Sequence, residues 1–216
     1  MKIAGIDEAG KGPVVGPMII AGVMIPETRV TLLEQLSLRD SKALSPKRRE
    51  FLAGGIKKVA KYHILEVSAR QIDALRERMT MNEIMVVSYA KVLKELKPDR
   101  VFVDAADVDP RRFAQNVRKK YGASIDIISE HNADVKYPIV SAASILAKVR
   151  RDAAMRDLEK RIGQEMGSGY PSDPRTMHFL ENWVQKHGSL PIFVRHSWKT
   201  AQAVLKKHGQ SSLSKF

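Results

Sequence analysis

Four acidic residues in this sequence stand where a metal-dependent site would need them. Asp7 and Glu8 come at the end of a predicted strand, Asp104 ends a later apolar strand, and Asp134 stands just before a long predicted helix. Loops at the strand ends of an open α/β sheet converge on a crevice, so side chains at these points can meet. Clustered carboxylates repel one another unless a cation neutralises them, and hard oxygen ligands suit Mg²⁺ or Mn²⁺. A single acid is better explained as a solvated or capping residue, although for Asp104 the apolar strand Val101-Phe102-Val103 before it makes the two interpretations equal. The prediction of a metal site therefore depends on all four.

The adjacent pair of acids raises a question of geometry. Neighbouring residues of a regular strand point to opposite faces of the sheet, so Asp7 and Glu8 cannot enter one pocket from an undistorted strand. Either the strand is distorted there, or Glu8 acts through its backbone carbonyl or from the far side of the sheet.

A glycine-rich turn, Gly10-Lys11-Gly12-Pro13, follows this pair directly. Together with Gly5 it satisfies most of a phosphate-loop pattern, but Gly12 stands where that motif needs Ser or Thr to bind magnesium. A dinucleotide-binding fingerprint is not matched either, because Gly16 comes one residue late. Two interpretations remain: a turn whose backbone approaches a ligand closely, and a plain tight turn between strands.

The elements that must position these residues are predicted from hydrophobic pattern and capping signals. We predict strands over residues 2–9, 17–25, 62–67, 100–104 and 124–129. Predicted helices begin at Ser45-Pro46 and at the capping box Thr80-Met81-Asn82-Glu83, and others cover residues 110–121, 138–162, 174–187 and 197–207. This order predicts an α/β protein with a mixed five-stranded sheet flanked by helices and a helical C-terminal region.

The composition favours a polyanionic partner. Lys and Arg total 37 against 24 Asp and Glu, which gives a formal net charge of +13. Contacts from Lys and Arg to phosphates release condensed counterions, so nucleic acid is favoured over a basic protein with no such partner.

The chain has no cysteine, which excludes disulfides and thiolate zinc sites. No secretory signal and no apolar stretch long enough to span a bilayer is visible, so we expect a cytoplasmic protein.

Several longer blocks of the sequence point to one family. They are Ile6-Asp7-Glu8-Ala9-Gly10-Lys11-Gly12-Pro13, Asp40-Ser41-Lys42 with Lys47-Arg48-Arg49, Val103-Asp104, Ala133-Asp134 with residues 141–149, residues 167–174 with Arg175-Thr176, and Trp198-Lys199-Thr200. Taken in this order over residues 1–205, the chain resembles the type 2 ribonuclease H family (ribonuclease HII), in its archaeal form.

The resemblance implies a ribonuclease H-like fold and a set of site residues. The family's four catalytic and metal-binding acids fall on Asp7, Glu8, Asp104 and Asp134. Its glycine turn falls on Gly10, Lys11 and Gly12, where it contacts the 2′-hydroxyl of a ribonucleotide, and its tyrosine falls on Tyr170, next to the following nucleotide. The chain departs from the family at Lys11, where Arg is more usual, and at Asn132, where many members carry Lys. Basic residues that are candidates for phosphate contacts are Lys42, Arg48, Lys148 and Arg151.

The implied function is an endonuclease that acts on RNA in hybrid with DNA. We expect it to cut the RNA strand of RNA–DNA hybrids and to cut 5′ of ribonucleotides embedded in duplex DNA, in replication primer removal and ribonucleotide excision repair. The reaction would be in-line attack of a water activated by Mg²⁺ or Mn²⁺, leaving 5′-phosphate and 3′-hydroxyl ends. Two rival functions are kept for comparison: a phosphate-loop nucleotide hydrolase, which the Gly12 mismatch disfavours and ATP turnover would reveal, and a non-catalytic basic nucleic-acid-binding module.

The end of the chain carries a candidate partner-binding motif. Gln210, Leu213 and Phe216 match the spacing of a peptide that binds the sliding clamp, and such peptides dock apolar anchors into a groove. The alternative is a disordered tail.

We expect a catalytic domain over residues 1–165, a helical region over 166–208 that completes the substrate site, and a flexible tail over 209–216. We expect the protein to be a monomer.

Overall fold

The computed structural model describes residues 1–38 and 44–213, with side chains to residue 210. Its centre is a sheet of five strands in the order β3-β2-β1-β4-β5. β1 (Lys2–Ala9) pairs antiparallel with β2 (Met18–Pro26), and parallel with β4 (Arg100–Asp104), which pairs parallel with β5 (Asp126–Glu130). β3 (Lys61–Val67) lies at the other edge, beside β2. The predicted mixed sheet is therefore confirmed.

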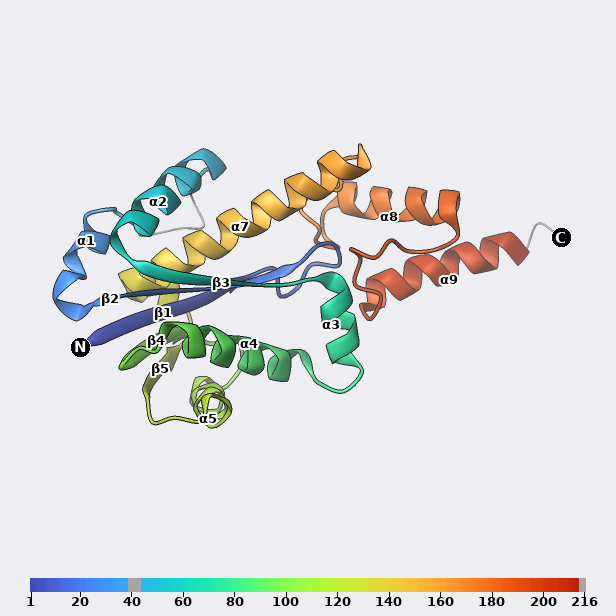
Figure 1. The fold of residues 1–216 in the computed structure, drawn as a ribbon. Coiled ribbons are helices and arrows are strands. Elements are labelled where there is room, and N and C mark those ends of the chain that lie inside the picture. The colour runs from blue at the N-terminus through green and yellow to red at the C-terminus, as the bar shows by residue number, and fades with distance from the viewer. Residues whose placement is uncertain (39–43, 214–216) are drawn as a thin grey trace. The chain divides into compact units, whose positions relative to one another are not determined.

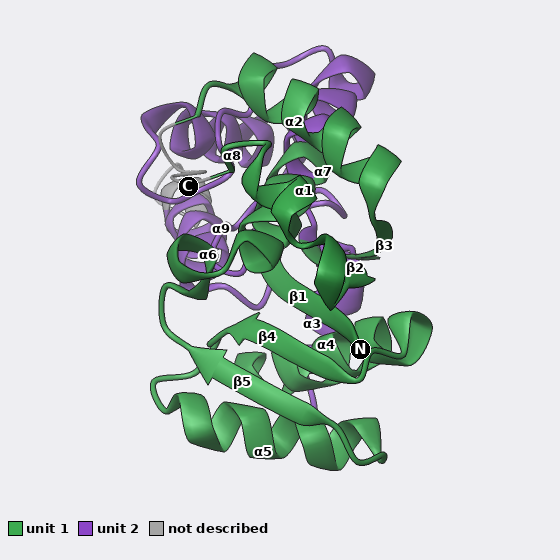
Figure 2. Ribbon diagram, turned by 90° about the vertical axis from the view of Figure 1, so that its left-hand side faces the viewer, with its two compact units in different colours: residues 1–9, 19–66, 79–150 green, residues 10–18, 67–78, 151–216 purple. Residues whose placement is uncertain are grey.

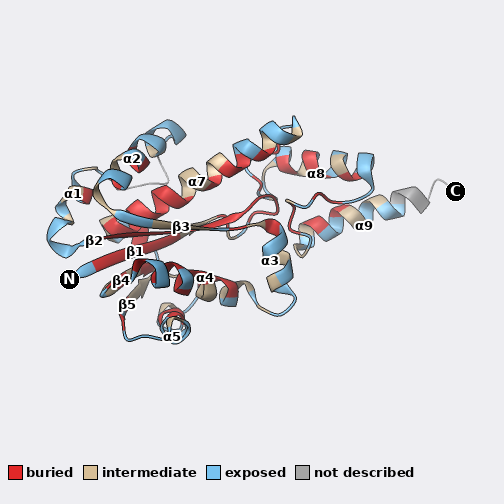
Figure 3. Ribbon diagram, viewed as in Figure 1, coloured by how far each residue is buried: buried red, intermediate tan, exposed pale blue. Residues whose placement is uncertain are grey.

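The central strand β1 is covered by helices on both faces. Part of α7 (Pro138–Ile162) and α2 (Pro46–Val59) pack on one face, and α4 (Met81–Leu96) and α5 (Pro110–Tyr121) lie on the other (Figure 1). Side chains alternate along β1: a Cβ on Gly5 would collide with the backbone of Ile139 in α7, whereas Ile6 lies beside Gly22, whose own Cβ would meet Val92 of α4. Both faces of the strand are therefore packed, which explains its apolar sequence (Figure 3).

The remaining helices are short or lie late in the chain. They are η1 (Glu27–Arg29), α1 (Thr31–Glu34), α3 (Ala69–Arg76), α6 (Ala133–Lys136), α8 (Pro174–His187) and α9 (Lys199–Leu213). Within the described part of the chain, no helix is both long enough and apolar enough to cross a bilayer.

Tertiary contacts divide the chain into two units (Figure 2). Unit 1 comprises residues 1–9, 19–66 and 79–150 and contains the sheet. Unit 2 comprises residues 10–18, 67–78 and 151–216, and its core gathers Val14 and Val15 against side chains from α7, α8 and α9, such as Met155, Phe179 and Val204. The domain boundaries expected at residues 165 and 208 stay a prediction.

Most predicted elements are present, with differences at their ends. The strand predicted over 124–129 begins and ends later, at Asp126–Glu130, and the last helix extends from Lys199 to Leu213 rather than ending at residue 207. α9 thus reaches into the tail expected over residues 209–216, and the flexibility of this tail stays a prediction. The helices α1, α3 and α6 were not predicted, although α3 begins with a capping box in which Ser68 and Gln71 bond each other's backbone N–H groups.

Candidate active site

Asp7 and Asp104 are placed together by strand register. Ile6 of β1 pairs with Val103 of β4, so Asp7 and Asp104 are the next residues on two neighbouring parallel strands. Phe102 packs against the core beneath α7, and Asp104, two residues further on, shares that face of the sheet. Because parallel strands end at the same edge, both carboxylates lie at the carboxyl edge of the sheet, where a ligand site is expected.

The side chain of Asp7 is buried, being only 5% exposed. Its Oδ1 accepts a 2.7 Å hydrogen bond from the backbone N–H of Glu8, and Ser144 of α7 also bonds its carboxylate. Burial, and then the negative charges of Glu8 and Asp104, raise the pKa of Asp7 well above its usual range. The charged form of this carboxylate is thus disfavoured by its surroundings, and a nearby cation would reverse that.

Glu8 points to the opposite face of the sheet, toward α4. Its Oε2 accepts a 2.5 Å hydrogen bond from the hydroxyl of Tyr89, a residue of α4 with no exposed surface. Of the alternatives left open by the sequence, this arrangement corresponds to a Glu8 side chain on the far side of the sheet, and its role in the site stays a prediction. Burial, and then the charges of Glu8 and Asp7, raise the pKa of Tyr89 well above its usual range, so its hydroxyl stays a donor.

Asp134 is linked to the same sheet edge through α6. Oδ1 of Asp104 accepts a 3.0 Å hydrogen bond from the backbone N–H of Ala133, the residue before Asp134. Asp134 itself is 4% exposed, and its backbone carbonyl accepts a hydrogen bond from the hydroxyl of Ser141 in α7. The tight turn into α6 requires a left-handed backbone at Asn132, with φ 57°. Asn tolerates this conformation better than Lys, which gives a structural reason for Asn here.

The donor chemistry of these four residues fits a hard divalent cation. All four offer carboxylate oxygens, and the pKa of Asp7 is raised first by burial and then by neighbouring negative charges that such an ion would neutralise. Among the residues that the structure describes, however, no three Asp, Glu or His side chains converge closely enough to enclose an ion as they stand. The fit is therefore one of ligand type and charge.

The glycine turn belongs to unit 2, and its backbone is held by two side chains from the C-terminal part of the chain. The guanidinium of Arg195, which has no exposed surface, donates to the carbonyls of Gly10 at 2.6 Å, Lys11 at 2.9 Å and Gly16 at 3.2 Å. Nε1 of Trp198 donates to the carbonyl of Gly12 at 3.0 Å. Three consecutive carbonyls are thereby fixed, which is more than a plain tight turn needs.

The backbone of the turn requires glycine at position 10. Gly10 has φ +87°, and a Cβ there would lie 2.4 Å from Nε of Arg151. Gly12 is different, because a Cβ there would meet only the ring of Tyr170, at 3.6 Å. Tyr170 therefore lies next to Gly12 within unit 2, and 39% of its surface is exposed.

Arg151 supports this region from within. It is 7% exposed, its Nη2 donates to the carbonyl of Ser168 at 3.0 Å, and its guanidinium lies 5.5 Å from the ring centre of Tyr170. Burial, and then the charge of Arg151, lower the pKa of Arg195 to about 9. This placement favours a role for Arg151 in holding loops together rather than in binding a phosphate directly.

The other basic candidates differ in accessibility. Arg48 is exposed on α2, where its guanidinium stacks over Phe51 at 5.2 Å, while Lys148 on α7 and Lys11 are half-buried. Lys42 lies outside the described residues, as does Phe216 at the chain end. Gln210 is exposed on α9, and Leu213 ends that helix.

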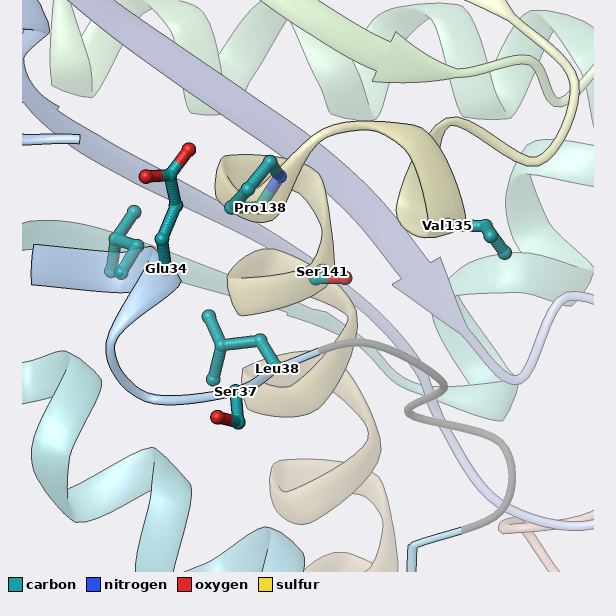
Figure 4. Close-up of a pocket in the computed structure, with 7 residues that line it drawn as sticks. Glu34, Ser37, Leu38, Val135, Pro138 and Ser141 are labelled. Atoms are coloured by element: carbon teal, nitrogen blue, oxygen red, sulfur yellow. The ribbon is translucent and has the colours of Figure 1, made fainter. Parts of the chain in front are cut away.

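A pocket in unit 1 is lined by residues other than the four proposed catalytic acids. It is lined by Leu33, Glu34, Ser37, Leu38, Val135, Pro138 and Ser141 (Figure 4), and none of the four acids is among its lining residues. Ser141 connects the two places, because its hydroxyl bonds the carbonyl of Asp134.

Sequence reasoning gave no role to three residues: Tyr89 and Ser144, which contact acids in unit 1, and Arg195, which holds the glycine turn in unit 2. Tyr89 falls on the apolar stripe of α4, where an aromatic is read as core, and Arg195 lies far from the turn in sequence. Only the block Trp198-Lys199-Thr200 indicated that the chain near Arg195 matters, since Trp198 comes three residues after Arg195.

Comparisons with known proteins show the family and the fold of this chain. The sequence profile of the family described as Ribonuclease HII matches residues 4–201. The Ribonuclease HII of Methanosarcina barkeri is 55% identical, over 98% of this chain and 100% of its own length. The solved structure of ribonuclease H2 from Pyrococcus horikoshii OT3 has a TM-score of 0.91 and 41% identity, covering 97% of this chain and 100% of that one.

Two further solved structures contain a bound partner protein or a bound metal ion. One is the PCNA:RNase HII complex from Archaeoglobus fulgidus, with a TM-score of 0.86 and 42% identity, covering 92% of this chain and 96% of that one. The other is Bst-RNase HIII in complex with Mn²⁺, with a TM-score of 0.84 at 17% identity, covering 97% of this chain and 71% of that one, a likeness of fold alone. The fold is therefore that of ribonuclease H. The chain belongs to the ribonuclease HII family, divalent-metal-dependent hydrolases that cleave the RNA strand of RNA–DNA hybrids.

Proposed function

We propose that this protein cuts duplex DNA on the 5′ side of single embedded ribonucleotides, as well as longer RNA–DNA hybrids. Recognition of one ribose depends on its 2′-hydroxyl, the only group that separates RNA from DNA locally. The observation that carries the proposal is the fixed backbone of residues 10–12, whose three carbonyls are held by Arg195 and Trp198. A rigid backbone with no side chain at Gly10 and Gly12 suits hydrogen bonds to a hydroxyl that must approach closely.

The proposed catalytic residues are Asp7, Glu8, Asp104 and Asp134. Bound Mg²⁺ or Mn²⁺ would activate the attacking water and stabilise the leaving 3′-oxygen. Asp7 and Asp104, adjacent on parallel strands, would be the central ligands, with Glu8 and Asp134 completing the set. A Mn²⁺ complex in a protein of the same fold supports this choice of ions. The products would carry 5′-phosphate and 3′-hydroxyl ends.

Substrate contacts are proposed for a second group of residues. Gly10, Lys11 and Gly12 would contact the ribose, and Tyr170, exposed next to Gly12, would stack on the adjoining sugar or base. Lys42, Arg48 and Lys148 are the proposed phosphate contacts. Primer removal and ribonucleotide excision in the cytoplasm are the processes that such a reaction would serve.

The test is cleavage of an end-labelled DNA duplex that contains one ribonucleotide, with and without Mn²⁺. We expect one metal-dependent cut, immediately 5′ of the ribonucleotide, and no cut in the all-DNA duplex. An end-group assay should find a 5′-phosphate. If long hybrids are cut and the single ribonucleotide is not, the proposed specificity is wrong although the family activity stands.

We also propose that the chain end binds the sliding clamp through Gln210, Leu213 and Phe216. The support is the motif spacing, the exposure of Gln210 on α9 and the PCNA complex solved for a relative with 42% identity. Titration calorimetry with the clamp should show that Phe216→Ala loses binding and that Lys215→Ala keeps it. Equal affinity of the F216A variant and the unaltered protein would refute this proposal, and hybrid cleavage without the clamp serves as the control for folding.

A further inference from the structure

We propose that Tyr89 is a positioning residue of the carboxylate site, acting through Glu8. This inference deepens the proposed function and rests on it. Tyr89 has no exposed surface, and its hydroxyl donates to Oε2 of Glu8 at 2.5 Å. The same hydroxyl lies 3.4 Å from the backbone carbonyl of Asp104. One buried group therefore contacts two of the strand ends that carry the proposed metal ligands.

The packing of Tyr89 leaves its ring little freedom. It is surrounded by the buried face of α4, and its ring meets that of Phe113 in α5 edge to face, with centroids 5.1 Å apart and planes at 82°. A ring fixed in this way presents its hydroxyl from a constant position. A hydrogen bond from a fixed donor to a carboxylate in turn selects one rotamer of that carboxylate, here the rotamer of Glu8.

The chemistry of the contact explains why a hydroxyl is present there. A Phe would fill the same apolar space, yet the tyrosine oxygen has been buried beside three acidic residues, where only a donor is favourable. With Oε2 bonded to Tyr89, the carboxylate of Glu8 is held in one orientation, in which it would help to hold a divalent cation. Partners that orient a ligand in this way are worth about 10–100-fold in metal affinity or activity.

A second consequence concerns the face of the sheet. Asp7 and Glu8 point to opposite faces, so Glu8 needs support from the α4 side that Asp7 does not need. Asp7 has its own support from Ser144 on the α7 side. We therefore infer that Tyr89 holds Glu8 on the α4 side of the sheet, as Ser144 holds Asp7 on the α7 side, so that both acids can serve one site.

The experiment compares Tyr89→Phe with a matched control, Tyr137→Phe. Tyr137 also donates a hydrogen bond to a glutamate, to Oε1 of Glu130 at 2.9 Å, but Glu130 is not one of the four acids. Mn²⁺ affinity is measured without substrate by calorimetry, and kcat and KM are measured on an RNA–DNA hybrid. We expect Y89F to lower Mn²⁺ affinity and kcat by about 10–100-fold with an unchanged KM, and Y137F to change neither.

The possible outcomes separate this inference from the proposed function. Equal Mn²⁺ affinity and kcat in Y89F and the unaltered protein would refute the role of Tyr89, while loss of both in Asp7→Asn would leave the proposed site intact. Full activity of the D7N variant would instead refute the proposed site itself. Thermal unfolding of Y89F distinguishes positioning from packing: a loss of kcat explained wholly by unfolded protein at the assay temperature would also refute the inference.

Discussion

Individual carboxylates in this protein have different surroundings, and these set different roles. Asp7 is buried among other acids, and its pKa is raised by burial and by the charges of Glu8 and Asp104. Asp104 also has a structural contact, the 3.0 Å bond from the N–H of Ala133 that ties β4 to α6. The proposed catalytic role and the structural role of Asp104 can therefore be separated by substitution.

We expect Asp104→Asn to lose metal-dependent cleavage and to keep the stability of the fold. The Asn side chain still offers an oxygen to the N–H of Ala133, but it has lost the negative charge that binds a cation. Asp104→Ala should lose cleavage as well and should lower the free energy of unfolding by about 1 kcal/mol, because the hydrogen bond is gone. Denaturant unfolding and a hybrid cleavage assay measure the two effects. Normal cleavage by D104N would show that Asp104 is not a metal ligand.

Sequence reasoning could locate the four acids but not the residues that form hydrogen bonds with them. Asp7 and Asp104 follow strands whose apolar pattern is plain in the sequence, so their position at strand ends could be predicted. The partner of Glu8 is 81 residues away and that of Gly10 is 185 residues away. A buried Tyr or Arg reaches such a partner only through the tertiary fold, and no local pattern records which backbone or carboxylate it meets.

The elements of this protein could be predicted where capping and periodicity agree. α4 begins where the sequence indicated, because Thr80 and Glu83 form a capping box ahead of a long apolar stripe. The same box at Ser68 and Gln71 begins α3, which is only eight residues long, too short for its periodicity to stand out. α1 and α6 have four residues each, too few for a periodic pattern, and the start of α6 is held by a tertiary contact between Asp104 and Ala133.

Substitution of Gly12 tests whether the glycine turn contacts the ribose. Gly12→Ala should fold normally, because a Cβ there makes only an ordinary contact with Tyr170 at 3.6 Å. It should nevertheless slow cleavage by about 10–100-fold, since a displacement of the ribose of the order of 1 Å has effects of that size. Denaturation midpoints and kcat/KM on a hybrid are the measurements.

Gly10→Ala provides the contrast. Its φ of +87° and the 2.4 Å approach to Arg151 should lower the free energy of unfolding by more than about 1 kcal/mol. If G12A cleaves hybrids as the unaltered protein does, the turn does not contact the ribose, whatever G10A shows.

The molecule as a whole carries a charge of +13, which bears on how strongly it binds hybrids. Removing one cation that pairs with a phosphate should reduce the dependence of log affinity on log salt by about one unit. Arg48→Gln removes an exposed cation on α2, and we expect this reduction for it. Arg29→Gln, in η1 and outside the proposed site, should leave the salt dependence unchanged. Fluorescence anisotropy over a range of salt concentrations measures the slope, and equal slopes for R48Q and the unaltered protein would remove Arg48 from the residues that bind substrate.

The family and sheet architecture could be predicted because their signals are spread along the whole chain. The division into units could not be read in the same way, because unit 2 gathers residues 10–18, 67–78 and 151–216 from three separate stretches. Residues 10–18 continue directly from β1 in sequence but pack with α8 and α9, because Val14 and Val15 are buried in the core of unit 2.

The carboxylates at the edge of the sheet are proposed to hold the divalent ions that activate water for cleavage of the RNA strand. The most direct measurement compares Asp7→Asn with the unaltered protein in cleavage of an RNA–DNA hybrid with Mg²⁺ and with Mn²⁺, alongside hybrid affinity in a binding assay. We expect D7N to abolish cleavage with either ion and to leave hybrid affinity largely intact. Cleavage by D7N at the rate of the unaltered protein with Mg²⁺ would contradict the assignment of this site.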